Sequence, residues 1–156
     1  RNYKILAASG SLGPKQYRGD CQVPEGIYRI TALNPASRYH LSMKINYPNS
    51  YDLKRARDDG RENLGGDIFI HGRAASRGCI AVGNVAIEEL FLLVAKTGRN
   101  RVSVIIAPND LRKNGCEANL PSQPSWLPDL YKTIAQELAK FKVREEAQNV
   151  TLSGNM

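Results

Sequence analysis

A histidine and a cysteine at the inner ends of two neighbouring apolar runs are the residues of this sequence best suited to catalysis. His71 ends the run that begins at Asp67, and Cys79 begins the next run eight positions later. A cysteine acts as a nucleophile when a base takes its proton, and histidine does so near neutral pH. The pattern predicts a strand, a loop and a strand that bring imidazole and thiol together. A buried structural cysteine beside a hydrogen-bonded histidine is the alternative.

Glycines and arginines shape the loop between these two residues. Gly78 permits a sharp turn before the sulfur, and the backbone N–H groups of Gly78 and Cys79 are candidates for holding a developing oxyanion. Gly72 frees the chain in the same way after the histidine. Arg73 and Arg77 could bind a substrate carboxylate or favour the thiolate of the cysteine. Surface arginines without a role are the alternative.

The string HGRAASRGCIAVGN, residues 71–84, resembles the signature of the YkuD-type L,D-transpeptidase catalytic domain. In that signature an HG precedes an S-x-G-C-[IV] segment that carries the nucleophile. Many members have a longer spacing and a second histidine where Arg77 stands. The short form, with Tyr47-Pro48-Asn49 upstream, is similar to the YafK-like branch. The resemblance runs from about Tyr3 to Asp110.

The resemblance implies acyl transfer through a thioester. Cys79, deprotonated by His71, would attack the carbonyl of meso-diaminopimelate in a peptidoglycan stem peptide. With an amine acceptor, the protein is an L,D-transpeptidase. With water, it is a hydrolytic member of the family, either an L,D-carboxypeptidase or an amidase that releases a wall-linked lipoprotein. The resemblance also implies a periplasmic or otherwise exported protein, and we expect a monomer that needs no cofactor.

Two other classes of function remain open at this stage. A non-catalytic wall-binding module would keep the fold and the basic surface, but it has no need of a thiol and its base. A redox sensor would pair Cys79 with Cys21 or Cys116 as the resolving thiol. Cys21 and Cys116 could instead form a disulfide with each other in an oxidising compartment, or remain free.

Four other polar or aromatic positions have both a functional and a structural interpretation. Ser76 could orient the catalytic histidine or cap the turn. Tyr47 is a candidate substrate contact, or an aromatic anchor that holds its loop on the core. His40 falls on the polar face of its strand and has no nucleophile beside it, so we expect it to be exposed. Glu88 and Glu89 suit the positive end of a helix dipole and are interpreted as structural.

Composition limits the class of protein. The chain has 156 residues, of which 42% are hydrophobic, and this favours one domain over 1–148 with a flexible tail over 149–156. No run approaches the roughly 18 apolar residues that span a bilayer, and Arg1 is not followed by a signal segment, which fits a processed chain. The net charge of +7 suits a polyanionic sacculus. No zinc-ligand set, RNP-like segment or basic helix supports nucleic-acid binding, and two histidines with three dispersed cysteines suggest no metal site.

Hydrophobic periodicity predicts a mainly β, α+β domain with two helices, consistent with the β-sandwich-like catalytic fold that the resemblance implies. One helix follows Gly83-Asn84, which offer an N-cap, and ends near Gly98; the other spans about 126–148. The segment 46–66 is predicted to be a long polar loop bordering the site, and 111–125 an irregular connection. The predicted strands cover 3–7, 26–33, 39–45, 67–71, 79–82 and 101–107.

Overall fold

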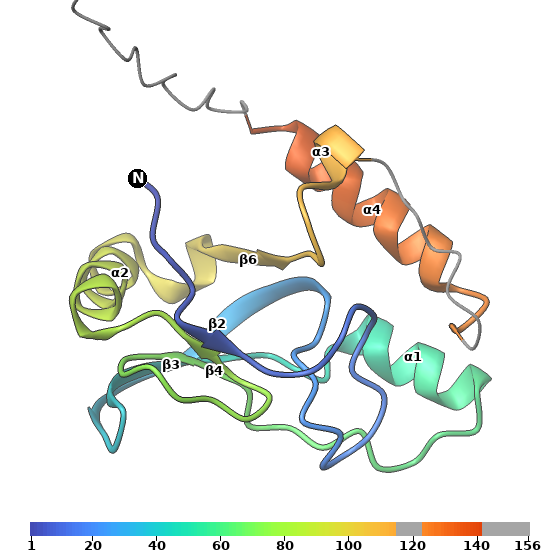
Figure 1. The fold of residues 1–156 in the computed structure, drawn as a ribbon, viewed down its shortest axis with the longest axis horizontal. Coiled ribbons are helices and arrows are strands. Elements are labelled where there is room, and N and C mark those ends of the chain that lie inside the picture. Colours follow the sequence, from blue (N-terminus) through green and yellow to red (C-terminus); the bar gives the residue numbers. More distant parts are fainter. Residues whose placement is uncertain (115–122, 142–156) are drawn as a thin grey trace, which may run out of the picture.

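The computed structural model describes residues 1–114 and 123–141, and its strands form one mixed six-stranded sheet (Figure 1). The order across the sheet is β1-β5-β4-β3-β2-β6. Neighbouring strands are antiparallel except β4 and β5, which are parallel. The predicted α+β class is confirmed. The strands are β1 (Ala7–Ala8), β2 (Gly26–Ser37), β3 (His40–Ile45), β4 (Phe69–His71), β5 (Ile80–Ala81) and β6 (Ser103–Ile106).

The long strand β2 joins the two halves of the sheet. Its residues 26–29 pair with β6, whereas the part from Ile30 onward pairs with β3. The strand continues through Pro35, although the sequence predicted that it would end there. Pro35 lies where the pairing with β3 is irregular, so the N–H that proline lacks is not needed by the ladder.

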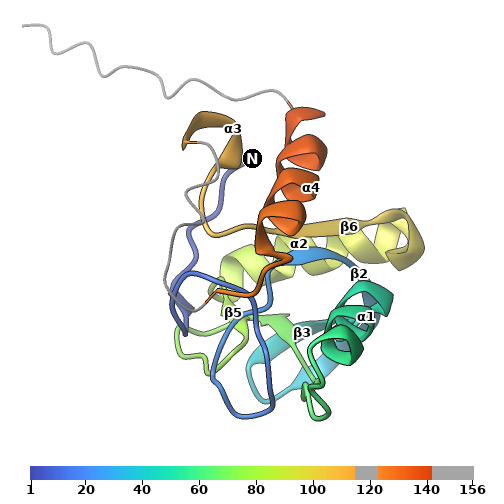
Figure 2. The same cartoon turned by 90° about the vertical axis from the view of Figure 1, so that its right-hand side faces the viewer.

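In Figure 1, α2 lies to the left of the strands and α1 to the right. The helix α4 lies above β6 in both views (Figures 1 and 2). The helix α2 contacts β3 and β4, whereas α4 contacts α3, β2 and β6. Both predicted helices are present as α2 and α4. The C-terminal helix is shorter than the predicted 126–148, because α4 ends at Ala139 with Lys140 as its C-cap. The tail predicted at 149–156 lies outside the described part. The helices are α1 (Ser50–Asp58), α2 (Asn84–Thr97), the 3₁₀ turn η1 (Arg99–Arg101), α3 (Leu111–Asn114) and α4 (Leu127–Ala139).

The prediction of a structureless loop over 46–66 is wrong, because α1 forms inside it. The Asn49 side chain accepts hydrogen bonds from the N–H groups of Tyr51 and Asp52, and the Asp52 carboxylate accepts one from the Asn49 N–H at 2.8 Å. This reciprocal capping box is visible in the sequence as Asn-x-x-Asp. The short helix α3 likewise replaces the start of the predicted irregular connection.

Two predicted strands are shorter than expected. The strand predicted over 3–7 is reduced to β1, because its partner β5 offers only two residues. The strand predicted over 101–107 is reduced to β6, since η1 occupies its first position. The two shortened strands are the edge strands, at opposite ends of the strand order.

Two groups of buried apolar side chains hold these elements together. The larger group joins the sheet to α2 and includes Ile45 and Ile87, both without exposed surface. The smaller group lies around α3 and α4 and centres on Leu127 and Ile134. Within the described ranges, no helix is long and apolar enough to cross a membrane.

Candidate active site

His71 is the last residue of β4 and lies in the interior, with 3% of its surface exposed. It pairs with Ser42 on β3 and with Ala81 on β5. Its Nδ1 lies 2.7 Å from the carbonyl oxygen of Gly72. A carbonyl oxygen can only accept, so Nδ1 carries the proton of the neutral ring, and Nε2 is left as the acceptor. The group that fixes this tautomer is a backbone atom, which no residue pattern reveals.

An aromatic side chain covers the imidazole. Tyr39, in the turn between β2 and β3, places its ring 4.6 Å from the ring of His71, measured between centroids, at an interplanar angle of 41°. The turn therefore packs directly against the histidine. Sheet pairing, the Gly72 carbonyl and this ring together hold the imidazole in place.

Cys79 reaches the same place through the parallel pairing of β4 and β5. The register matches Ile70 with Ile80 and His71 with Ala81, so Cys79, one residue before β5, falls beside Phe69. Alternate residues of a strand share a face, and this places the cysteine and the histidine on the same side of the sheet. Both line one cavity of about 300 Å³. The predicted strand, loop and strand are present.

The surroundings of Cys79 favour the protonated form of its thiol. Burial raises its pKa, and the nearby Asp67 adds to this effect, whereas a backbone hydrogen bond at Phe69 and the charge of Lys15 act in the opposite direction. The sulfur donates to the carbonyl oxygen of Asp67 at 3.8 Å. Lys15 is thus a cation that favours the thiolate. The thiolate bias expected from Arg73 and Arg77 stays a prediction.

Serine hydroxyls accept hydrogen bonds from the backbone N–H groups of Gly78 and Cys79. Gly78 has a φ of +80°, so the predicted sharp turn before the sulfur is confirmed. Its N–H donates to Oγ of Ser9 at 2.5 Å, and the N–H of Cys79 donates to Oγ of Ser76 at 3.1 Å. Of the two roles predicted for Ser76, the structure supports capping of the loop.

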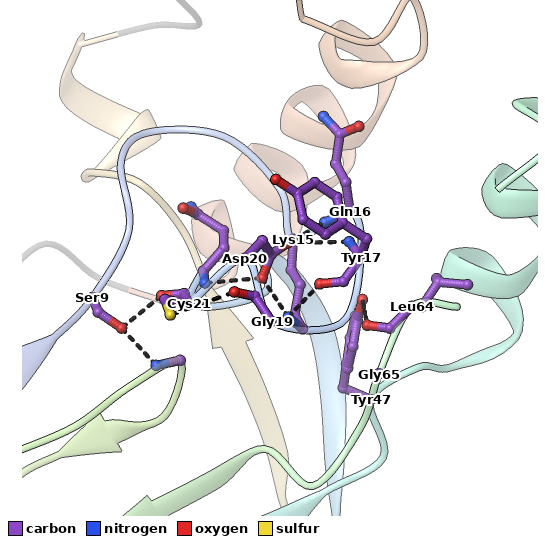
Figure 3. A network of polar contacts seen from close by, with 12 residues as sticks. Ser9, Lys15, Gln16, Tyr17, Gly19, Asp20, Cys21, Tyr47, Leu64 and Gly65 are labelled. Carbon is purple, nitrogen blue, oxygen red and sulfur yellow. Dashed lines mark hydrogen bonds and ion pairs between the residues drawn. The ribbon is translucent and has the colours of Figure 1, made fainter. Parts of the chain in front are cut away.

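The N-terminal loop between Ser9 and Cys21 contains a network of polar contacts (Figure 3). Ser9 also donates to the carbonyl oxygen of Cys21 at 2.6 Å, which ties this loop to Gly78. Within the loop, Lys15 forms a buried ion pair with Asp20. Sequence reasoning found only the turn-forming glycines here and missed Ser9 and Lys15.

The N-terminal loop borders a second cavity, of about 600 Å³. Lys15 and Arg18 bring positive charge to it from this loop. Arg77 and Cys79 line this cavity and also the smaller one that contains His71. The thiol therefore lies between two spaces, and Arg77 is the loop arginine that faces both.

Three predicted site residues have other positions. Tyr47 is buried, with 4% of its surface exposed, and its hydroxyl donates to the carbonyl oxygen of Leu64 at 3.3 Å. Of the two roles predicted for Tyr47, the structure supports the aromatic anchor in the core, and the predicted substrate contact is wrong. Arg73 lines neither cavity. Gly72 has an ordinary φ and owes its place to the close approach of Tyr39 and Asn84.

The remaining candidates are structural or lie outside the described part. His40 is exposed, as predicted, and its Nε2 lies 2.5 Å from a carboxylate oxygen of Glu88. Glu89 accepts a hydrogen bond from the hydroxyl of Tyr3. Cys116 is not among the described residues, so the Cys21–Cys116 bridge stays a prediction. In residues 1–114 and 123–141, no group of three or more histidine, cysteine, aspartate or glutamate side chains could hold a metal ion.

The fold and the site together define a class: an α+β domain that presents a thiol and an oriented imidazole at adjacent strand ends. Residues 1–106 match the family model of the YkuD L,D-transpeptidase catalytic domain. The chain belongs to this family, and the resemblance of the segment 71–84 is confirmed.

The chain is similar to individual proteins over part of their length. The chain is 42% identical over 112 residues to the proposed L,D-transpeptidase YafK of Escherichia coli (strain K12), an alignment covering 69% of this chain and 43% of YafK. It is similar to a solved structure of the helical cell shape determining protein Pgp2 from Campylobacter jejuni, at 30% identity and a TM-score of 0.44 over 55% of this chain and 32% of Pgp2. Bd1075 of Bdellovibrio bacteriovorus shows 22% identity and a TM-score of 0.43 over 81% of this chain and 43% of its own.

Proposed function

We propose that this chain is a cysteine-dependent L,D-transpeptidase that acts on diaminopimelate-containing peptidoglycan stem peptides. One observation carries the proposal: Cys79 shares a cavity with a histidine whose Nδ1–H is held by the Gly72 carbonyl, so that Nε2 remains the basic nitrogen. Family membership supports a role in peptidoglycan chemistry. The same role places the protein in the periplasm or cell wall.

In the first half of the reaction, His71 Nε2 takes the proton from the thiol as the sulfur attacks the diaminopimelate carbonyl carbon. The raised pKa of Cys79 supports this order, because the resting thiol holds its proton. The N–H groups of Gly78 and Cys79 then hold the oxyanion. They exchange the neutral serine hydroxyls that they now bind for a charged oxygen, which is the stronger acceptor.

The intermediate collapses to a thioester, and the departing amine receives the proton from His71. In the second half, an amine of another stem peptide attacks the thioester carbonyl and gives its proton to His71. The C–S bond then breaks, a new amide bond remains, and the departing Cys79 thiolate recovers the proton from His71. Two cavities meet at the sulfur, which favours two peptide substrates over one peptide and water. Arg77 faces both cavities and is placed to pair with stem-peptide carboxylates.

Intact-protein mass spectrometry tests the proposal. The protein is incubated with a diaminopimelate-containing tetrapeptide muropeptide and, separately, with a carbapenem, whose β-lactam ring acylates nucleophiles. We expect an adduct that maps to the peptide containing Cys79 and is lost in Cys79→Ala. Product analysis then separates a cross-linked dimer from a shortened monomer, which would indicate the L,D-carboxypeptidase instead.

A lipoprotein-linked muropeptide completes the test. Its release as free lipoprotein would identify the amidase. If a folded sample forms no adduct and turns over none of these compounds, the catalytic proposal is refuted and a wall-binding module takes its place. In a catalytic protein, His71→Gln should keep the thiol but lower the acylation rate by about 100-fold or more.

A further inference from the structure

The peptide unit between Gly72 and Arg73 is held at both of its polar ends. Its carbonyl oxygen accepts the hydrogen bond from Nδ1 of His71 at 2.7 Å, and its N–H donates to Oδ1 of Asn84 at 2.9 Å. A peptide unit is planar and rigid. Whatever fixes the direction of the N–H therefore fixes the direction of the carbonyl that holds the histidine.

Arg73 makes this support necessary. Its φ is +58°, a left-handed conformation that costs a residue with a side chain about 1–2 kcal/mol. Its own carbonyl oxygen accepts from the N–H of Gly83 at 3.1 Å. The strained residue is thus held on one side by the backbone before α2 and on the other side by the Asn84 side chain. Loss of either contact would release the strain by rotating the peptide unit.

The side chain of Asn84 does not cap its own helix. It is the first residue of α2, and the N-cap position belongs to Gly83, which makes no side-chain capping bond. Asparagine near a helix start commonly caps that helix. Here the side-chain oxygen instead crosses to the loop that follows β4. Asn84 is also exposed to solvent, so replacing it opens no hole in the core.

We propose that Asn84 is a positioning residue that keeps His71 in the Nδ1–H tautomer. This inference rests on the proposed function, in which Nε2 is the base. In the other tautomer Nε2 carries the proton and cannot accept one from the thiol. Asn84 touches neither the sulfur nor the reacting carbonyl; it acts through the Gly72–Arg73 peptide unit.

The test reads the tautomer directly. Nitrogen-15 NMR of the imidazole is recorded near pH 8, where an unperturbed histidine is neutral. A His40→Gln background leaves His71 as the only histidine. Asn84→Leu removes the acceptor of the Arg73 N–H, Asn84→Asp keeps one, and Asn100→Leu is the matched control at an exposed asparagine of η1. The rate of Cys79 acylation by a carbapenem is measured for the same proteins.

We expect the Nδ1–H tautomer in the parent, in Asn84→Asp and in Asn100→Leu. Asn84→Leu should populate the Nε2–H tautomer and lose about 100-fold in acylation rate, the scale of loss that follows a small misplacement of a catalytic group. A folded Asn84→Leu with parental tautomer and parental rate would overturn the inference. If the parent itself is not acylated while the tautomer still changes, the proposed function fails and the role of Asn84 stands.

Discussion

Replacing Gly72 with alanine should destabilise the protein and impair its site together. A Cβ on Gly72 would lie 2.6 Å from the carbonyl oxygen of Tyr39, 2.8 Å from Oδ1 of Asn84 and 3.1 Å from Cβ of His40. The nearest of these atoms belongs to the backbone of the turn between β2 and β3. It can retreat only if the turn moves, and the turn carries the ring that packs on His71.

The size of the effect follows from this crowding. Overpacking of a well-packed site costs about 1–3 kcal/mol. For a domain of this length, each kcal/mol lowers the unfolding midpoint by about 2–4 °C, which gives a fall of about 2–12 °C. Acylation of Cys79 should fall by about 100-fold, because Tyr39 and Asn84 both support the histidine.

Gly66→Ala is the matched control. A Cβ there would meet nothing closer than the carbonyl oxygen of Tyr47 at 3.9 Å, and the residue has no positive φ. It should keep or raise stability by about 0.4–1 kcal/mol, because alanine restricts the unfolded chain. Thermal unfolding followed by circular dichroism compares the two variants. Equal midpoints for Gly72→Ala and Gly66→Ala would refute the steric reasoning.

Three further predictions concern pH, thiol reactivity and packing. Burial raises the pKa of Asp52 to about 6 in the folded protein. The contribution of the protonated carboxyl to folding stability is therefore complete below the pKa of about 4 in the unfolded chain, and it is lost as the pH rises through 6. Between pH 4 and pH 7, the free energy of unfolding in urea should therefore fall by on the order of 3 kcal/mol more for the parent than for Asp52→Asn. Parallel curves of unfolding free energy against pH for the two proteins would contradict this. Lys15→Met should shift alkylation of Cys79 by iodoacetamide to higher pH, whereas Lys15→Arg should not; an unchanged profile would exclude this electrostatic role. Ile134→Ala, at a fully buried position of α4, should lower the free energy of unfolding by about 2–5 kcal/mol. Thr133→Ala, at an exposed position, should change it by no more than about 0.5 kcal/mol. An unchanged unfolding transition in Ile134→Ala would mean that α4 does not unfold together with the sheet.

Local pattern determined much of this protein. The apolar runs on either side of the segment 71–79 predicted β4 and β5, because strands with buried side chains show as short apolar segments. The spacing of Ile87, Leu90 and Val94 predicted α2, since one face of a helix repeats every three to four residues. The family signature followed from the same segment. The capping box at Asn49 was also readable in the sequence as Asn-x-x-Asp, and it marks the start of α1 within the predicted loop.

Tertiary structure decided the environment of the reacting groups. Ser9 meets Gly78 across 69 positions of the chain, and Tyr39 meets His71 through the pairing of β3 with β4. The tautomer of His71 depends on a backbone carbonyl, whose direction depends on Asn84. The thiol of Cys79 and the imidazole of His71 could be identified from the sequence, because their chemistry belongs to the side chains themselves. Long-range packing set the direction of the pKa shift of the thiol and the tautomer of the imidazole, because these depend on burial and on partners brought together only by folding.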